Sequence, residues 1–199
     1  SFSKKPGGVS FNITNLNLQK NSIFRQFFFM SLNPAGNVQK SGYNAPITNV
    51  QRNIEVKWLL GGATLWRRDI IEDNKVDKVN LSWAVCEDLM FSYPISKYEQ
   101  LYVCAKAKTL HVDDKVYLTY SDTLKRSKIG ILRRYEFVCQ NIELSKTLFF
   151  WMLIGQILGR IFLLPKNIKE ELGYLMGTIL GLVICVKYLL LRKKISFYY

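Results

Sequence analysis

The hydrophobic positions of the chain are concentrated in its last quarter, where two long apolar runs lie close together. TLFFWMLIGQILGRIFLL covers residues 147 to 164 and LGYLMGTILGLVICVKYLLL covers residues 172 to 191, lengths of 18 and 20 residues. A helix of about 20 apolar residues is long enough to cross a bilayer. The short polar segment PKNIKEE between the runs predicts that they form an antiparallel helical hairpin.

Three structures are compatible with these runs: a hairpin that crosses a membrane, one that lies flat or re-enters at its surface, and a buried hairpin of a soluble domain. Each run carries one cation near its end, Arg160 or Lys187, where a long side chain reaches the headgroups. An interior glycine costs a helix in water about 1 kcal/mol relative to alanine, whereas in lipid glycines at every fourth position let helix backbones approach closely. The glycines with this spacing are Gly155, Gly159, Gly173, Gly177 and Gly181. Length and spacing together favour a membrane-associated hairpin.

The segment from residue 115 to 146 is basic, with seven Lys or Arg and three Asp or Glu, a net charge of 7 − 3 = +4. A solvated helical face is the ordinary explanation of such a segment, but its position directly before an apolar run favours basic linker or collar helices at a membrane surface. Basic residues also follow the second run, whereas Glu170 and Glu171 balance the loop between the runs. The positive-inside rule therefore predicts that both outer flanks lie in the cytosol and the loop on the far side.

The rest of the chain predicts strands and short helices. Residues 1 to 53 are polar apart from the burst IFRQFFFMSL (23 to 32), which predicts a short helix or strand between loops. IEVKWLLGGATLWRRDII (54 to 71) first alternates and then becomes helical, so we expect a strand, a tight Gly61-Gly62 bend and a short helix. EQLYVCAKAKTLHV (99 to 112) alternates and predicts a strand that ends at His111. The fold class predicted from these elements is α/β.

The stretch SWAVCEDLMFSY, residues 82 to 93, places two carboxylates, Glu87 and Asp88, inside a hydrophobic run. Acidic side chains are rarely buried unless they are paired or coordinated. We expect Asp88 in the first turn of a helix that reaches about Tyr98. The pair is then either a helix-start cap or a functional site, and the flanking composition favours neither.

Composition narrows the choice of partners. The 199 residues include 28 Lys or Arg and 15 Asp or Glu, a formal charge of +13, so we expect an anionic partner such as nucleic acid, phosphate groups or anionic lipid. The chain has no helix-turn-helix, zinc-finger or RNP-type motif, and two runs of bilayer length argue against a nucleic-acid partner. Its four cysteines are widely spaced without a CxxC, which argues against a zinc site or a disulfide framework.

The strand, Gly-Gly bend, Arg-Arg helix, Glu-Asp helix start and final strand with a histidine occur in a specific order. This order resembles the second half of the family 2 glycosyltransferases, inverting enzymes of the GT-A (nucleotide-diphospho-sugar transferase) fold. The matching segments are VKWLLGGATLWRRDII (56 to 71), VDKVNLSWAVCEDLMFSYPISKYEQLYVCAKAKTLHV (76 to 112) and, more weakly, GNVQKSGYN (36 to 44). The segment GYLMGTILGL near the C-terminus is similar to the membrane-proximal end of bacterial members.

The resemblance implies roles for the acidic pair and the histidine. In the family, the aspartate of the pair is the general base that takes the proton from the acceptor hydroxyl as it attacks the sugar, and the matching residue is Asp88. Glu87 would position the acceptor or support Asp88. In several members the histidine binds the divalent metal, Mn or Mg, on the diphosphate of the nucleotide-sugar donor, which makes His111 a predicted metal ligand. A single histidine is more often structural, so both roles stay open.

The resemblance also implies a substrate-binding set. Gly61 and Gly62 match the bend on the acceptor side, and Trp58 would stack on a sugar. Arg67 and Arg68 would reach phosphate, although a solvated helix face explains them almost as well.

The chain departs from the family pattern at two places. Pro94 replaces an arginine that often follows the acidic pair, and it should kink or shorten the helix. No DxD element is present to bind metal and nucleotide diphosphate. We therefore expect residues 1 to 114 to be a partial GT-A domain that carries the acceptor and base half, and we expect this chain alone to be incomplete and inactive.

The predicted organisation is a partial GT-A domain (1–114), basic linker or collar helices (115–146) and a two-helix membrane-associated hairpin with a basic tail (147–199). The predicted function is transfer of a sugar from a nucleotide-sugar to a lipid-linked or polysaccharide acceptor, with inversion, at the cytosolic face of a membrane in cell-envelope synthesis. The alternative is a non-catalytic, membrane-anchored basic domain that binds anionic lipid or acts as an assembly subunit.

Overall fold

The computed structural model of the chain describes residues 5–16, 20–74, 85–112, 119–163 and 168–191. The chain divides into two compact units. The first, which we name the sheet unit, comprises Ser1–Ser22, Ser31–Val38 and Asn44–Asp114. The second, named the helical unit, comprises Ile23–Met30, Gln39–Tyr43 and Lys115–Tyr199.

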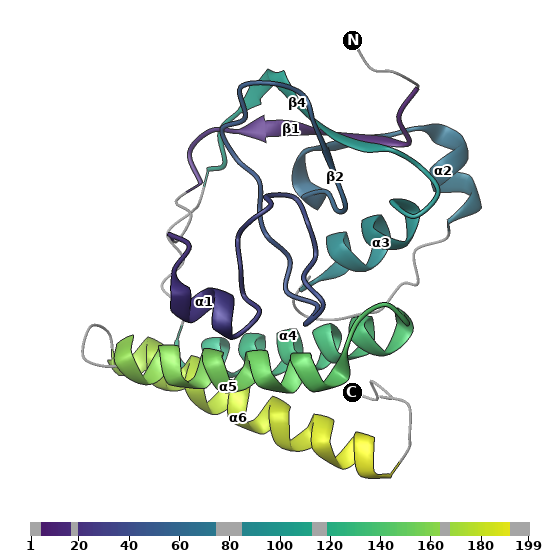
Figure 1. Cartoon of the computed structure of the whole chain (residues 1–199). Helices are drawn as coiled ribbons and strands as arrows, with labels where there is room; N and C mark the ends of the chain where they lie inside the picture. The colour runs from purple at the N-terminus through teal and green to yellow at the C-terminus, as the bar shows by residue number, and fades with distance from the viewer. Residues whose placement is uncertain (1–4, 17–19, 75–84, 113–118, 164–167, 192–199) are drawn as a thin grey trace. The chain divides into compact units, whose positions relative to one another are not determined.

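The sheet unit contains a four-stranded mixed sheet with the strand order β2-β4-β1-β3 (Figure 1). Its strands are β1 (Gly8–Ile13), β2 (Ile54–Val56), β3 (Thr64–Trp66) and β4 (Leu101–Thr109). β1 pairs with β4 in parallel and with β3 antiparallel, whereas β2 pairs with β4 antiparallel. The mixed α/β class predicted from the sequence is therefore confirmed, and this sheet alone does not identify a GT-A domain.

Three short helical segments connect the strands: the 3-10 turn η1 (Gly61–Ala63), α2 (Arg68–Asp73) and α3 (Glu87–Ile95). The predicted strand, bend and helix in residues 54 to 71 are present, but the prediction missed β3, which lies between the bend and α2 and pairs with β1. α3 begins at the acidic pair as predicted and ends earlier than predicted. Pro94 lies in its last turn, and because proline has no N–H it cannot continue the helical hydrogen bonds.

The core of the sheet unit lies on one face of β4. Leu101, Val103 and Ala105 are buried in alternation, as the sequence pattern predicts for a half-buried strand. They pack with a cluster of buried side chains from the neighbouring segments. The other members of the cluster are Ile47, Val50, Val56, Leu59, Ile70 and Ile95.

β1 was not predicted, because its apolar side chains do not mark its buried face. Ser10 and Asn12 are buried, whereas Phe11 is 36% exposed. The Asn12 side chain is satisfied there, since it accepts a hydrogen bond from the Val50 N–H (3.0 Å) and donates to the carbonyls of Val50 (2.9 Å) and Ala105 (3.3 Å). Buried polar groups with partners cost little, so a strand can carry this reversed pattern.

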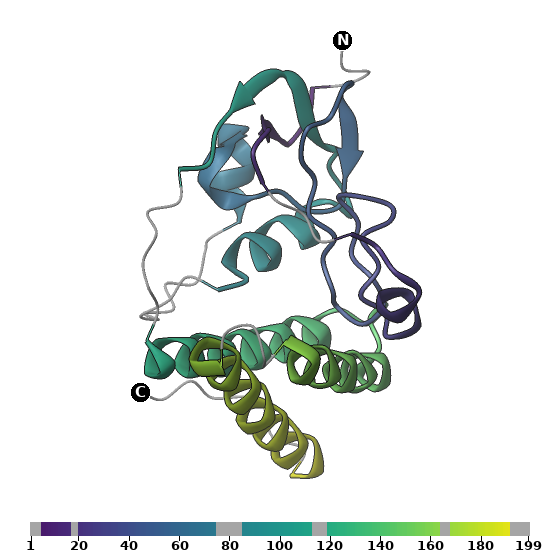
Figure 2. The same cartoon turned by 90° about the vertical axis from the view of Figure 1, so that its left-hand side faces the viewer.

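The helical unit consists of the short helix α1 (Ile23–Phe27) and three long helices, α4 (Tyr120–Gln140), α5 (Lys146–Leu163) and α6 (Ile168–Leu190) (Figures 1 and 2). α4 begins with a capping box in which the Thr119 hydroxyl accepts from the Asp122 N–H at 3.2 Å and Asp122 accepts from the Thr119 N–H at 3.1 Å. These bonds to Thr119 hold the pKa of Asp122 below its usual value. Most of the described part of the basic segment is thus one helix with a capped start, and the segment leaves this helix after Gln140.

The glycines of α6 face α4. An added Cβ at Gly177 would collide with the Leu124 carbonyl oxygen, and one at Gly181 would lie 2.8 Å from Ile131 Cβ. The Ser127 hydroxyl of α4 donates to the Tyr174 carbonyl of α6 at 3.0 Å. Because successive glycines of α6 meet successive turns of α4 in the same direction, the two helices run parallel. The glycine spacing therefore does mark a close helix approach, with α4 as the partner.

α5 contacts other parts of the helical unit. Its Gly155 lies against the Phe28 side chain, and Phe28 stacks on Trp151 with the ring centroids 5.1 Å apart. Arg160 forms an ion pair with Glu171 of α6 at 2.9 Å and lies 4.3 Å from the centroid of the Tyr174 ring. Arg160 thus links α5 to α6 through these two contacts. The sequence had predicted instead that its side chain reaches lipid headgroups.

Two helices among the described residues are long and apolar enough to cross a membrane, Lys146–Leu163 and Ile168–Leu190. Only 22% of α5 and 28% of the most apolar stretch of α6 is buried within the protein. The other residues of the two helices are half-buried or exposed, which supports the predicted membrane association.

The glycine contacts predict opposite effects for two equivalent substitutions. Gly177→Ala should lower the free energy of unfolding of the helical unit by about 1 to 3 kcal/mol, because its methyl group meets α4 backbone. Gly159→Ala is the matched control, since its Cβ would lie 3.8 Å from the nearest Phe24 atom and alanine favours the helix by up to about 1 kcal/mol. Thermal unfolding in detergent, followed by circular dichroism, measures both. Equal shifts in the same direction would contradict the α4–α6 packing.

Candidate functional site

The candidate site lies at the carboxyl ends of β1 and β4. In the parallel register Ile13 of β1 is opposite Thr109 of β4, so the chain leaves both strands at the same edge of the sheet. Asn15 then binds the backbone of His111 twice, donating to its carbonyl at 2.7 Å and accepting from its N–H at 2.8 Å. His111 follows the end of β4 by two residues and is held there by a segment 96 positions away.

Asp88 enters the site from the first turn of α3. The residue at the N-cap, Cys86, has φ 64° and ψ 10°, a left-handed conformation that is uncommon for a side chain other than glycine. Asp88 Oδ1 accepts a hydrogen bond from the Leu89 N–H at 2.8 Å. The carboxylate thus satisfies a helix-start amide and also lines the site, so the capping and functional interpretations of the acidic pair are compatible. Strained backbone of this kind tends to occur at functional positions.

Ser92 fixes the distance between α3 and the Gly-Gly bend. Its buried hydroxyl donates to the Asp88 carbonyl at 2.6 Å and accepts from the Leu59 N–H at 3.0 Å. A Cβ at Gly61 would lie 3.3 Å from Asp88 Cβ, whereas one at Gly62 would meet no atom within 4 Å. A side chain at residue 61 would therefore be tight against Asp88, whereas Gly62 faces open space.

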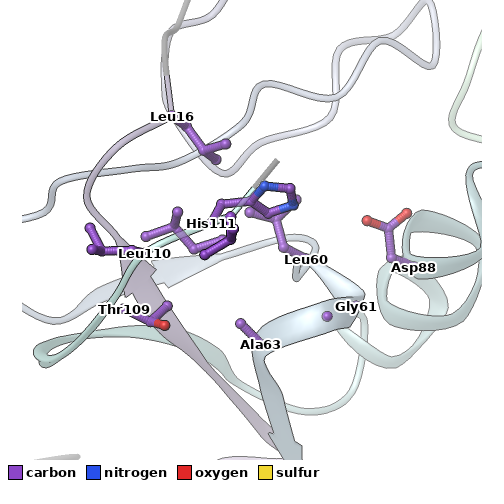
Figure 3. A pocket seen from close by; sticks show the side chains of 11 residues that line it. Leu16, Leu60, Gly61, Ala63, Asp88, Thr109, Leu110 and His111 are labelled. Carbon is purple, nitrogen blue, oxygen red and sulfur yellow. The ribbon is translucent and has the colours of Figure 1, made fainter. Parts of the chain in front are cut away.

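These segments enclose an open pocket of about 350 Å³, shown in Figure 3. In that view the Asp88 carboxylate and the His111 imidazole point into the pocket from α3 and from the segment after β4. The remaining lining is mostly apolar. It consists of Ile13, Leu16, Leu60, Gly61, Gly62, Ala63, Thr109, Leu110 and Val112. Pockets of this size and mixture, with few polar groups on an apolar wall, are typical of small-molecule sites.

The other predicted site residues lie outside the pocket lining. Trp58 is 3% exposed and its indole N–H donates to the Ala45 carbonyl at 3.0 Å. A ring buried in this way offers no face to a sugar, so the predicted stacking role does not fit the structure. Glu87 precedes Asp88 in the first turn of α3, is partly exposed and does not line the pocket.

The two predicted phosphate-binding arginines are held by acidic neighbours. Arg67 donates to Glu99 at 2.8 Å and to Asp69 at 2.7 Å, and these bonds, to Asp69 first, raise its pKa above the usual value. Arg68 is exposed and pairs with Glu72 at 2.6 Å, one turn along α2. Arg68 thus has the contact of a solvated helix face, which was the alternative to phosphate binding. The Arg67 side chain is 22% exposed and links the start of α2 to Glu99, so it forms a half-buried structural pair.

Metal binding would need ligands beyond this pocket wall. Within the residues that the structure describes, no group of three or more His, Cys, Asp or Glu side chains is placed to hold a metal ion. His111 offers one imidazole and Asp88 one carboxylate, both suitable ligands for Mn²⁺. The remaining ligands of such an ion would have to come from a diphosphate, from water or from other residues.

Sequence reasoning missed the residues that position the site. Ser92 lies four residues after Asp88, and this helical spacing was a signal for a shared helix face. Cys86 and Asn15 gave no signal, because a left-handed backbone and a hydrogen bond across 96 residues are products of the tertiary fold.

Comparison with known proteins returns no match for the chain, whether among protein-family models, curated proteins or solved structures. The structure itself shows an α/β sheet unit with an open, largely apolar pocket at a parallel strand pair, in a chain with two helices of membrane-spanning length among its described residues.

The Ser92 contacts predict a specific loss of stability. Ser92→Ala leaves the buried Leu59 N–H without its partner and should lower the free energy of unfolding of the sheet unit by about 1 to 3 kcal/mol. Ser96→Ala is the matched control on the same helix, because the Ser96 hydroxyl bonds only a carbonyl one turn back and its loss should cost about 1 kcal/mol or less. Urea unfolding followed by tryptophan fluorescence compares the two. If Ser96→Ala lowers the free energy of unfolding as much as Ser92→Ala does, the hydrogen bond between Ser92 and Leu59 has no special stabilising role.

Proposed function

We propose that the chain is the acceptor-side part of a membrane-associated, inverting glycosyltransferase. The observation that carries the proposal is that the Asp88 carboxylate and the His111 imidazole, 23 residues apart in the sequence, line one open pocket. The resemblance of residues 56–71 and 76–112 to family 2 glycosyltransferases gives these two side chains their roles. Neither the shared pocket nor the sequence resemblance of these segments depends on the two apolar helices.

In the proposed reaction Asp88 is the general base. Its carboxylate takes the proton of the acceptor hydroxyl while that oxygen bonds to the anomeric carbon of the donor sugar, and the bond from this carbon to the nucleotide diphosphate breaks with inversion. The N-terminus of α3 favours the ionised carboxylate, because the partial positive charge of the helix start stabilises an anion. Gly61 leaves the space beside Asp88 that an incoming hydroxyl needs. Glu87 supports Asp88 from the same helical turn.

A divalent metal, Mn or Mg, would neutralise the charge that develops on the leaving diphosphate. His111 is the residue of this chain that would bind it. Asn15 holds the backbone of His111 at the pocket, so the residue that carries the imidazole is in place before any ligand arrives. The nucleotide-sugar itself would be bound largely by residues beyond these 199, because the sequence contains no DxD element.

The apolar surfaces of α5 and α6 and the charge of +13 support attachment to a membrane with anionic lipids. An enzyme attached in this way meets acceptors at the membrane surface, which suits a lipid-linked or polysaccharide acceptor. The positive-inside rule favours the cytosolic face, where nucleotide-sugars are made available.

The second candidate is a non-catalytic, membrane-anchored basic domain that binds anionic lipid or serves as an assembly subunit. The same apolar helices and positive charge favour it. The two candidates differ in one consequence: only a transferase requires the ionisable group of Asp88.

Replacement of the base tests the proposal. Asp88→Asn, made in the protein encoded by the gene that contains these residues, should reduce sugar transfer by about 10²- to 10⁴-fold, because the amide cannot accept the proton. Transfer is measured in membranes with a panel of radiolabelled nucleotide-sugars, and nucleotide-sugar binding should be retained. Asp73→Asn on the exposed side of α2 is the matched control and should leave transfer unchanged. Near-normal turnover by Asp88→Asn would reject the base assignment and favour the non-catalytic candidate.

Removal of the metal ligand gives a separate test. His111→Ala should keep both hydrogen bonds with Asn15, because they go to the backbone of residue 111, and circular dichroism checks that the variant is folded. Transfer by the wild-type membranes should stop with EDTA and return with Mn²⁺ or Mg²⁺, and the variant should need a higher metal concentration for half-maximal rate. An unchanged metal requirement in the variant would assign His111 a structural role.

A further inference from the structure

α6 has one face that the protein covers and another that it leaves uncovered. Its glycine face packs on α4 through Gly173, Gly177 and Gly181. At 3.6 residues per turn, Leu172, Met176, Leu180 and Val183 form a stripe about 100° around the helix from the glycines, on the side away from the buried Leu175, Thr178 and Cys185. These four side chains are between 36% and 59% exposed. The helix is therefore covered by protein on one side only, and its uncovered side is apolar.

The helix that covers α6 is highly charged. α4 contains five Lys or Arg and two Asp or Glu, a net charge of 5 − 2 = +3. Lys125 and Arg126 are exposed, in the turn that lies beside Gly177 of α6. Because α4 and α6 are parallel and in contact over several turns, an α6 that crossed the bilayer would carry these cations into the hydrocarbon. Charges at that depth are costly and rare.

α5 has a similar uncovered stripe, with an aromatic edge. Trp151, Ile154, Leu158 and Ile161 lie along one side of the helix and are between 37% and 46% exposed. α1 packs beside this stripe: the Trp151 indole N–H donates to the Phe27 carbonyl at 2.9 Å, and the Phe27 ring is 59% exposed. Tryptophan and phenylalanine beside an apolar stripe are typical of a segment at the level of the lipid headgroups.

We propose that the helical unit binds one leaflet of an anionic membrane from a single side and does not cross it. The uncovered stripes of α5 and α6 lie among the acyl chains, and α4 stays on the headgroup side with its cations near anionic phosphates. In this arrangement the end of α5 and the start of α6 lie on the same side of the membrane as α4. This inference does not rest on the proposed transferase activity, and it replaces the crossing hairpin that the flanking charges predict.

A second copy of the chain is a weaker occupant for these stripes. The α4 cations on the same unit would repel each other in a dimer, whereas they attract an anionic leaflet.

Side-specific labelling tests the topology. In the full chain with its four cysteines replaced by alanine, Ser121→Cys places a thiol in the first turn of α4 and Lys169→Cys places one in the first turn of α6, both at exposed positions. A membrane-impermeant maleimide is applied to right-side-out spheroplasts and to inside-out vesicles from bacteria that express each variant. Both thiols should react from the same side of the membrane. Reaction of Lys169→Cys from the side opposite to Ser121→Cys would overturn the proposal.

Two further measurements cover the case in which the cysteine-free variant does not fold. Trypsin applied to inside-out vesicles that contain the unaltered chain should cleave after both Lys125 and Lys169, as read by mass spectrometry. Protection of Lys169 alone would overturn the proposal.

The purified chain should also bind preformed vesicles of phosphatidylcholine and phosphatidylglycerol (3:1), and the double variant Met176→Lys, Leu180→Lys should bind them at least tenfold more weakly. A soluble dimer that binds no vesicles would overturn the proposal in favour of a second copy.

Discussion

Parallel pairing of β1 with β4 is the constraint on which the candidate site depends. It places Gly8 opposite Leu101 and Ile13 opposite Thr109, so two segments that are far apart in the sequence leave the sheet at one edge. Their meeting there allows Asn15 to hold the backbone of His111. In α/β sheets ligands bind at the carboxyl ends of strands for this reason, because loops from different strands converge at that edge. The pocket is therefore a consequence of strand order before it is a consequence of any side chain.

Asp88 is positioned by a second, independent set of contacts. The left-handed backbone at Cys86 sets the direction of α3, and Ser92 ties α3 to Leu59 at the start of the Gly-Gly segment. Both sides of the pocket are thus held by side chains that do not line it, Asn15 and Ser92, which bond backbone groups. Supporting contacts of this kind outside a pocket lining hold a site in a defined geometry.

The sequence predicted those features that one local pattern determines. Alternation in β4 identified Leu101 and Val103 as core, and the hydrophobic run around Glu87 and Asp88 identified the start of α3. β1 was missed because Ser10 and Asn12 are its buried side chains, an arrangement that becomes favourable only when distant carbonyl and N–H groups satisfy them. Glycine spacing predicted a close helix approach, but the choice of α4 as partner depends on the shape of both surfaces. The burial of Trp58 could not be predicted either, because its hydrogen bond to Ala45 forms only in the folded chain.

The two units are interleaved along the chain, since residues 23–30 and 39–43 belong to the helical unit although sheet-unit segments precede, separate and follow them. No single cut of the polypeptide can therefore release either unit intact. A fragment that stopped at residue 114 would retain α1 and its phenylalanines without α5, the helix against which Phe28 packs. Exchange of one unit between related genes would require several simultaneous crossovers, so the pocket and the apolar helices are expected to be inherited as one piece.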